Sequence, residues 1–207
     1  MKKIFIAVPT WNGTIPVELM ANLISMRLPE GYQKFFGYTK RTMVDVARNM
    51  LADGFLKQGY DYLFFVDDDT IPAIDTLEQM LKIDGDIVGV PVPARANGGE
   101  DRLCMYAKDR GGQLNKLKRT RKIFACGMSC TLIKRKVIEE MAKKYDYPFN
   151  FQMVKGVKYH EDINFCRKAN KLGFEVWATP LRVNPYHIGN PIAYTYEQDG
   201  IKSLVLP

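Results

Sequence analysis

The sequence lacks any long hydrophobic run. None of its 207 residues falls in an apolar stretch of the roughly 18 residues that suggest a membrane-spanning helix. The lysine-containing start, MKKIFIAV, has an apolar run only from Ile4 to Val8, and no small-residue cleavage site follows it. This start predicts a first β-strand rather than a signal peptide, and a protein that stays in the cytoplasm.

Cysteine is sparse, and none of the four cysteines forms a CxxC pair. They are Cys104, Cys126, Cys130 and Cys166. Cys126 and Cys130 are four residues apart in a segment with strand character, and neither histidine of the chain has a zinc-ligand spacing to them. The pattern argues against a structural zinc site and predicts free, buried thiols.

The composition shows no sign of disorder and no division into parts. Hydrophobic residues make up 46% and charged residues 26% of the sequence, as in globular chains long enough to bury one sizeable core. There is no internal repeat, linker or composition break. We therefore expect a single domain over residues 1–207.

Strand-like and helix-like segments alternate in the first half. Apolar runs predict strands over residues 3–8, 33–38, 61–66 and 86–92, and helical stripes predict helices over 16–28, 42–59 and 73–83. The run DYLFFV is apolar throughout, as expected for a central parallel strand covered on both faces. This alternation predicts an α/β fold, Rossmann-like, with a mostly parallel central sheet.

The second half is less regular. Residues 94–122 are rich in glycine and charge, with weak strand signals. The remaining expected elements are a buried strand around Gly127 (122–135), a helix (136–144), an aromatic, basic loop (145–159), a helix (161–172) and a strand (174–180).

The stretch YLFFVDDDTIP ends an apolar strand in three consecutive carboxylates, Asp67, Asp68 and Asp69. Like charges this close repel one another unless something positive lies among them. One interpretation is a solvated cap of a helix starting near Pro72. The other is a divalent cation site, because ligands bind beyond the carboxyl ends of strands in open α/β sheets, and Mg²⁺ and Mn²⁺ prefer oxygen ligands.

Four ordered segments resemble glycosyltransferases with the GT-A fold of the family 2 type. FFVDDDTIP, with ARN on the preceding helix, is similar to their DxD region, and ACGMSCTLIKRKVIEEM resembles their glycine-containing segment before the acceptor-side helix. HEDINFCRKANKLGFEVW resembles their ED-containing helix, and NPYHIGN their late metal-binding histidine. The resemblance implies a single Rossmann-like GT-A domain with a nucleotide-sugar-binding half over residues 1–92, an acceptor and catalytic half over 93–190 and a tail over 191–207. It also implies a smaller β region on the acceptor side.

On the donor side, the resemblance implies a nucleotide-diphosphate sugar, with UDP-sugar favoured, and Mn²⁺ or Mg²⁺. Asp67 would contact the ribose or the sugar, Asp69 would ligate the metal that bridges the diphosphate, and His187 would be its second protein ligand. From the residues alone, His187 is equally readable as an isolated surface histidine. Pro9 and Thr10 would border the nucleobase and ribose.

Three further residues belong to this donor region. The resemblance implies that Arg48 approaches the diphosphate or base. Asp68 is grouped with the donor-binding residues, although the motif gives it no task. We expect Trp11 to pack against the protein rather than to stack on a base.

On the acceptor side, the resemblance implies an inverting transfer. Asp162, the second acid of the ED pair, would be the general base that takes the proton of the acceptor hydroxyl, and Glu161 would orient it or bind the acceptor. Gly127 would lie beside the acceptor. From the residues alone, both acids also fit as helix N-terminal acids that favour the macrodipole, and a retaining mechanism stays open.

The net charge of +7 is concentrated in one basic segment, Lys108–Lys122. Its seven cations are Lys108, Arg110, Lys116, Lys118, Arg119, Arg121 and Lys122. Against Asp109 they give 7 − 1 = +6. The segment is either a solvated loop or a contact for a polyanion; for a glycosyltransferase, the acceptor would then be modified DNA, an acidic glycan or an anionic lipid carrier.

Two other functions remain open from the sequence. A nucleotidyltransferase acting on a sugar phosphate also holds a metal and nucleotide phosphates, but VPTWNGTIP is a poor version of the glycine-rich phosphate loop that such enzymes carry. A non-enzymatic module that binds nucleic acid through the basic segment would leave the DDD, ED and HIG motifs without a role.

Overall fold

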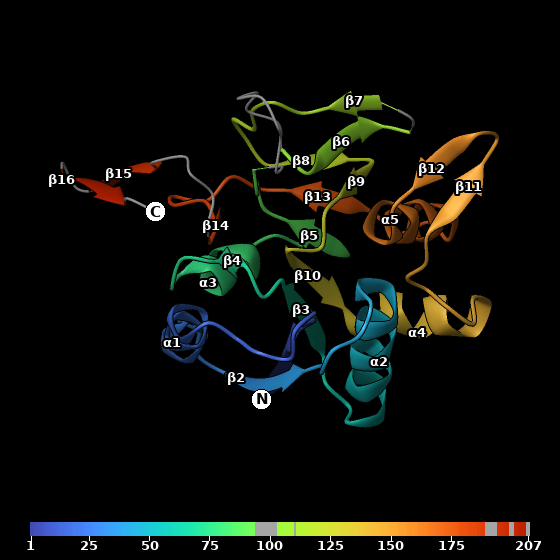
Figure 1. The fold of residues 1–207 in the computed structure, drawn as a ribbon, viewed down its shortest axis with the longest axis horizontal. Coiled ribbons are helices and arrows are strands. Elements are labelled where there is room, and N and C mark those ends of the chain that lie inside the picture. The colour runs from blue at the N-terminus through green and yellow to red at the C-terminus, as the bar shows by residue number, and fades with distance from the viewer. Residues whose placement is uncertain (94–102, 110, 189–193, 199–200, 206–207) are drawn as a thin grey trace.

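A seven-stranded mixed sheet forms the centre of the molecule, in the order β2-β1-β3-β10-β5-β13-β8 (Figure 1). The computed structural model describes residues 1–93, 103–109, 111–188, 194–198 and 201–205. The strands of the sheet are β1 (Lys2–Val8), β2 (Tyr32–Tyr38), β3 (Tyr62–Val66), β5 (Ile87–Gly89), β8 (Arg121–Ile123), β10 (Cys130–Lys134) and β13 (Val176–Ala178). All run in one direction except β8 and β10, which confirms the predicted α/β class with a mostly parallel sheet.

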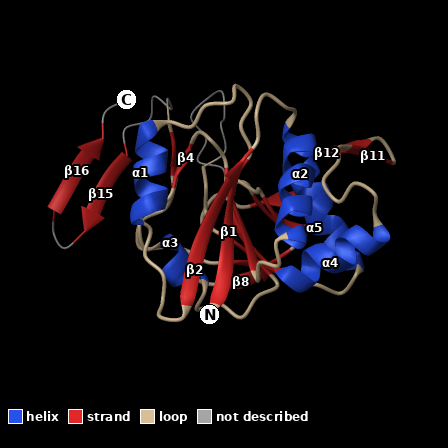
Figure 2. Ribbon diagram, turned by 90° about the horizontal axis from the view of Figure 1, so that it is seen from below, coloured by secondary structure: helices blue, strands red, loops and turns tan. Residues whose placement is uncertain are grey.

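Helices cover both faces of this sheet (Figure 2). One face carries α1 (Val17–Ser25) and α3 (Thr76–Met80), and the other carries α2 (Val44–Lys57), α4 (Arg135–Lys144) and α5 (Glu161–Lys171). Within the described part of the chain, none of the helices has both the length and the apolar character needed to cross a membrane.

The core lies in two clusters, one on each face of the sheet. Along β3, Leu63 and Phe65 point into the cluster under α2, α4 and α5, whereas Phe64 and Val66 point into the cluster under α1 and α3. Side chains of a strand alternate between its two faces, so a strand buried on both needs apolar residues at every position. This explains the unbroken apolar run before the aspartates.

Four small sheets surround the main one. They are β7-β6-β9 (Gly111–Gln113, Met105–Lys108 and Ala125–Cys126), β14-β4 (Tyr186–His187 and Thr70–Ile71), β11-β12 (Gln152–Val154 and Val157–Tyr159) and β15-β16 (Tyr194–Gln198 and Ile201–Val205). The three-stranded sheet agrees with the predicted separate β region of the second half. The pair β14-β4 joins segments far apart in the sequence, and it is the one that builds the functional site.

Two predictions for the second half were wrong. Residues 122–135 do not form one strand around Gly127: β8, β9 and β10 belong to two different sheets. The chain turns after Gly127, whose carbonyl accepts a hydrogen bond from Thr131 Oγ1 at 2.7 Å. The expected loop 145–159 contains the hairpin β11-β12, because Lys155 and Gly156 have φ angles of 49° and 77° and make the two-residue turn that hairpins favour.

Candidate active site

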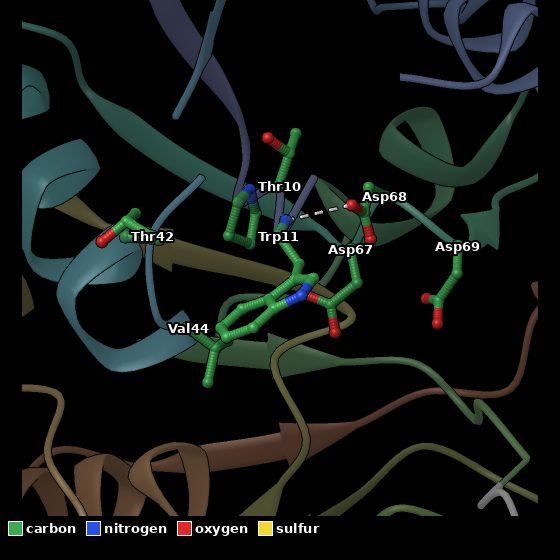
Figure 3. Close-up of a pocket in the computed structure, with 9 residues that line it drawn as sticks. Thr10, Trp11, Thr42, Val44, Asp67, Asp68 and Asp69 are labelled. Carbon is green, nitrogen blue, oxygen red and sulfur yellow. Dashed lines mark hydrogen bonds between the residues drawn. The ribbon is translucent and has the colours of Figure 1, made fainter. Parts of the chain in front are cut away.

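A pocket of about 160 Å³ opens where β1 and β3 end (Figure 3). Its walls are residues 9–11 after β1, the start of α2, and the three aspartates after β3. The structure therefore brings Pro9 and Thr10 together with Asp67, Asp68 and Asp69 around one pocket. Thr10 is buried and held by Thr39: its N–H donates to Thr39 Oγ1 at 3.1 Å, and its hydroxyl donates to the Thr39 carbonyl at 2.5 Å.

Trp11 stands at the rim of this pocket with 72% of its surface exposed (Figure 3). The expectation that it packs against the protein was wrong. The signal in the sequence was its position, three residues after the last residue of a strand that ends at the ligand-binding edge of the sheet. An exposed indole there offers a flat surface to a bound ring.

The three aspartates lie in a tight turn after β3. The Thr70 N–H donates to the Asp67 carbonyl at 3.0 Å, and β4 follows directly. The helix α3 begins only at Thr76, after Asp75 at its N-cap position, so the interpretation of the aspartates as a helix cap was wrong. Burial, opposed by hydrogen bonding to the Trp11 N–H, raises the pKa of Asp68.

Asp68 has a structural role that the motif did not supply. Its Oδ2 accepts a hydrogen bond from the Trp11 N–H at 3.4 Å (Figure 3). This bond ties the segment after β1 to the turn after β3, across the mouth of the pocket. Asp68 therefore shapes the pocket wall through the backbone of Trp11.

His187 is brought to this turn by the small sheet β14-β4, in which it pairs with Thr70. The side chain is 8% exposed, and its Nδ1 lies 3.4 Å from Asp69 Oδ1 and 3.3 Å from Thr70 Oγ1. Its Nε2 lies 3.0 Å from the Pro93 carbonyl, where it can only donate. With the proton on Nε2, the Nδ1 lone pair points towards Asp69, which is the arrangement that backbone carbonyls impose on metal-binding histidines.

The pair of Asp69 and His187 fits a divalent cation. Adjacent ligands of an octahedral ion with bonds of 2.0–2.1 Å lie about 3 Å apart, close to the 3.4 Å between Asp69 Oδ1 and His187 Nδ1. Among the described residues, no group of three or more His, Cys, Asp or Glu side chains converges on one point. A carboxylate with phosphate oxygens and water is a ligand set that both Mg²⁺ and Mn²⁺ accept, whereas the imidazole ligand favours a transition metal over Mg²⁺.

Arg48 joins the donor side of the site to the start of α5. It is 2% exposed; its Nη2 lies 2.9 Å from Asp67 Oδ1 and its Nε 3.2 Å from Glu161 Oε1. Burial raises the pKa of Asp67, and the charge of Arg48 opposes that shift. The guanidinium also lies over the ring of Phe65, 5.3 Å from its centroid. Nη2 and Nε of Arg48 are thus already paired with carboxylates of the protein.

Asp162 sits in the first turn of α5, where its Oδ1 accepts the Ile163 N–H at 2.6 Å. Burial, with a smaller contribution from the neighbouring Glu161 carboxylate, raises the pKa of Asp162 to about 7. The charge of Arg48 acts in the opposite direction. A carboxyl group with a pKa near neutrality is suited to accept and release a proton at physiological pH.

Gly127 lies against Asp162 and Cys104. A Cβ added to this glycine would meet the Cys104 Cβ at 2.9 Å and Asp162 Oδ2 at 3.5 Å. No side chain fits between them, so the glycine keeps the space beside the carboxyl group open. The structure thus places Gly127 beside Asp162, while Cys104 is a neighbour that no signal in the sequence identified. All four cysteines are free thiols, as predicted.

The basic segment runs from the end of β6 through β7 to β8 (Figure 1). The four cations predicted to contact a polyanion are all exposed: Lys116, Lys118, Arg119 and Arg121. Lys122 is engaged with Glu175 and lies over the ring of Trp177, and Arg110 lies outside the described residues. The exposed cations are available to an anionic partner.

No protein-family model and no curated protein sequence matches this chain. Solved structures do share its architecture. The structure of A197 from STIV superposes with a TM-score of 0.58 at 18% identity, over 100% of this chain and 94% of A197. TarS of S. aureus superposes in its complex with UDP at a TM-score of 0.56 and 14% identity.

The superposition with that UDP complex covers 92% of this chain and 61% of the TarS fragment. The complex of the same fragment with UDP-GlcNAc gives a TM-score of 0.56 at 14% identity, over 92% of this chain and 59% of the fragment. The chain therefore spans about three fifths of the length of these TarS fragments. Identities this low show a shared fold alone, and that fold is the GT-A-like α/β architecture.

Proposed function

We propose that the protein is a metal-dependent glycosyltransferase that moves a sugar from a nucleotide-diphosphate donor, UDP-sugar favoured, to an acceptor hydroxyl. The observation that carries the proposal is the meeting, at one edge of a GT-A-like sheet, of the aspartate turn, His187 and the ED pair of α5. The complexes of TarS with UDP and UDP-GlcNAc support a donor of this chemical class.

On the donor side, the pocket between β1 and β3 would receive the nucleoside. Pro9 and Thr10 would border the base and ribose, with Trp11 offering its exposed indole to a ring. Asp67 would bind a hydroxyl of the ribose or sugar, since it is fixed by Arg48 with one oxygen. Asp69 and His187 would hold Mn²⁺ or Mg²⁺, which when bound neutralises negative charge developing on the leaving diphosphate.

On the acceptor side, Asp162 would be the general base. The acceptor oxygen attacks the anomeric carbon of the donor sugar. The bond between that carbon and the diphosphate oxygen breaks, and the hydroxyl proton of the acceptor passes to the Asp162 carboxylate. The nucleoside diphosphate leaves with the bonding electrons, and the anomeric configuration inverts. Glu161 is held by Arg48 and so supports the turn that carries Asp162.

The acceptor we propose is a polyanion. The exposed cations of the basic segment attract the phosphate or carboxylate groups of a polyanion. Binding is favoured because it releases the counterions condensed on that polyanion. Modified DNA, an acidic glycan and an anionic lipid carrier share this chemistry, and a panel of the three separates them.

The donor half of the proposal is tested by thermal unfolding in the presence of UDP, GDP and ADP, with and without Mn²⁺. A ligand that binds only the folded protein at about 100 times its dissociation constant stabilises it by about 2.7 kcal/mol. We expect UDP to raise the melting temperature only when Mn²⁺ is present. Asp69→Ala should remove this shift, whereas Asp53→Ala, which changes an exposed aspartate of α2, should keep it.

Stabilisation by UDP to the same extent without metal would contradict the role of Asp69 and His187. Stabilisation by a polyanion alone, with no response to any nucleotide, would favour the nucleic-acid-binding module over an enzyme.

A further inference from the structure

Arg48 is a buried cation placed between the two halves of the site. It extends from α2, is 2% exposed, and lies over Phe65 of β3. Arginine is almost never fully buried unless it is paired. Its position therefore depends on the groups that compensate its charge.

Those groups come from segments far apart in the sequence. Asp67 ends β3 on the donor side, and Glu161 opens α5 on the acceptor side. The guanidinium holds one with Nη2 and the other with Nε, at 2.9 and 3.2 Å. Because guanidinium is planar and rigid, it fixes the two carboxylates relative to one another, which a lysine ammonium on a flexible stem does not do.

The charges around Arg48 do not balance. Asp67, Glu161 and Asp162 all act electrostatically on it, so one cation faces three acids and the ionised cluster carries 1 − 3 = −2. Nη1 of Arg48 is buried and, within the described residues, has no hydrogen-bond partner. An unused donor in a cluster with excess negative charge is not explained by structural pairing alone, because pairing would use it.

We propose that Arg48 is a positioning residue that locks the end of β3 to the first turn of α5 and so holds the Asp162 carboxyl group at a fixed place beside the donor-binding aspartates. This role rests on the proposed function. Through its contacts with Asp67 and Glu161, a shift of either half of the site is transmitted to the other.

The test compares three variants. Arg48→Lys keeps the charge and loses the fork, and Arg48→Met loses both. Arg135→Lys is the matched control, because Arg135 also pairs with a glutamate (Glu139), donates to two backbone carbonyls and lies over a phenylalanine, where the start of α4 meets the C-terminal end of α2. Each variant is first checked for cooperative unfolding, and Arg48→Lys alone suffices where Arg48→Met does not fold.

The first readout is the titration of Asp162 by carbonyl ¹³C NMR, with its signal assigned by its loss in Asp162→Asn. We expect the midpoint to rise by about one pH unit or more, about tenfold in proton affinity, in Arg48→Met. Arg48→Lys should give a smaller rise, and Arg135→Lys should match the wild type. An unchanged midpoint in both Arg48 variants overturns the proposal, and this readout needs no enzymatic activity.

The second readout is the hydrolysis of UDP-GlcNAc with Mn²⁺, in which water replaces the acceptor. A positioning role predicts kcat lowered about tenfold or more in Arg48→Lys, with KM for UDP-GlcNAc within about twofold of wild type. A raised KM with unchanged kcat makes Arg48 a donor-binding residue and overturns the proposal. If the wild type neither binds nor turns over any nucleotide sugar, the proposed function fails, while the titration still decides the role of Arg48.

Discussion

At the scale of single residues, the environment of Asp162 suits a proton transfer and also destabilises the folded state. Its carboxyl group is placed where water has limited access and other acids are close, and its pKa rises to about 7 as a result. A carboxylate there is costly to the folded state and useful to a proton transfer, which is the usual conflict between stability and activity at catalytic positions.

The pH dependence of transfer follows from this value. The base works only when ionised, so kcat/KM should fall about tenfold for each pH unit below about 7 and level off above it. Asp162→Asn should remove this dependence and lower the rate about 10²- to 10⁴-fold. Initial rates of sugar transfer or of UDP-GlcNAc hydrolysis between pH 5 and 9 measure both effects. A full rate in Asp162→Asn would mean that the base lies elsewhere or that the enzyme retains configuration.

The same substitution should stabilise the protein. A carboxyl group whose pKa is about 7 folded and about 4 unfolded binds more protons in the folded state between those values, so its contribution to stability is lost as pH rises from about 4 to about 7. Above pH 7, Asp162→Asn removes this cost, up to about 4 kcal/mol for a shift of about three units. Urea unfolding at pH 8 and at pH 4.5 should show the gain at pH 8 and little change at pH 4.5.

At the scale of elements, the local sequence pattern predicted the positions of single strands and helices but not the order of the strands in the sheet. The apolar run before Asp67 and the helical stripe of α2 were correctly placed, because the first marks a strand buried on both faces and the second marks the buried face of a helix. The position of β10 was not predictable in this way: its five apolar and polar residues say nothing of which two strands it enters between, or in which direction. The sheet order is a property of the whole chain.

The candidate site also has one part that the sequence predicts and one part that only the three-dimensional structure reveals. That Asp67 to Asp69 lie at the ligand-binding edge follows from a strand end, and that part was readable from the sequence. The approach of His187 to Asp69 depends on a two-residue pairing between β4 and β14, which no periodicity reveals; only the resemblance suggested it. The exposure of Trp11 and the contact of Cys104 with Gly127 required the structure.

The loop after α4 is anchored to α5 by a buried lysine. Lys168 of α5 is 7% exposed, and its ammonium donates to the Tyr147 and Pro148 carbonyls at 2.8 and 3.1 Å and also to Asn150 Oδ1. Lys168→Met leaves the Tyr147 and Pro148 carbonyls without this donor, while Asn150 Oδ1 still accepts a hydrogen bond from Asn164 Nδ2. We expect a loss of about 1–3 kcal/mol in unfolding free energy. Lys171→Met, in the same helix, changes a more exposed lysine and serves as the control; equal stability of the two variants would contradict the anchor.

At the scale of the whole molecule, the exposed cations of the basic segment lie apart from the acids of the candidate site. The acids gather at the edge of the main sheet, whereas the exposed cations gather on the segment between β7 and β8 and on β8 itself. Such a separation suits an acceptor that is long enough to touch both regions.

This separation predicts a selective loss. Replacing the four exposed cations Lys116, Lys118, Arg119 and Arg121 by glutamine should weaken binding of a polyanionic acceptor and make it less sensitive to salt, by about 0.7–0.9 in slope per lost phosphate contact. Binding of UDP with Mn²⁺ should not change. The test is the affinity for the acceptor measured between 50 and 300 mM salt. If the slope of log affinity against log salt concentration does not change, the basic segment is a solvated loop without a role in acceptor binding.

The antiparallel strand β10 has a consequence for how the protein is made. It hydrogen-bonds to both β3 and β5, yet it follows them in the chain. While the ribosome has delivered only the first 129 residues, both strands present an unpaired edge, and such edges invite pairing with other chains. Newborn copies on a polysome are thus exposed to one another until β10 emerges and inserts. The gap that it closes lies beside the aspartate turn, so the free edge of β3 and the support of that turn are completed in the same event, while the second edge of β5 waits for β13.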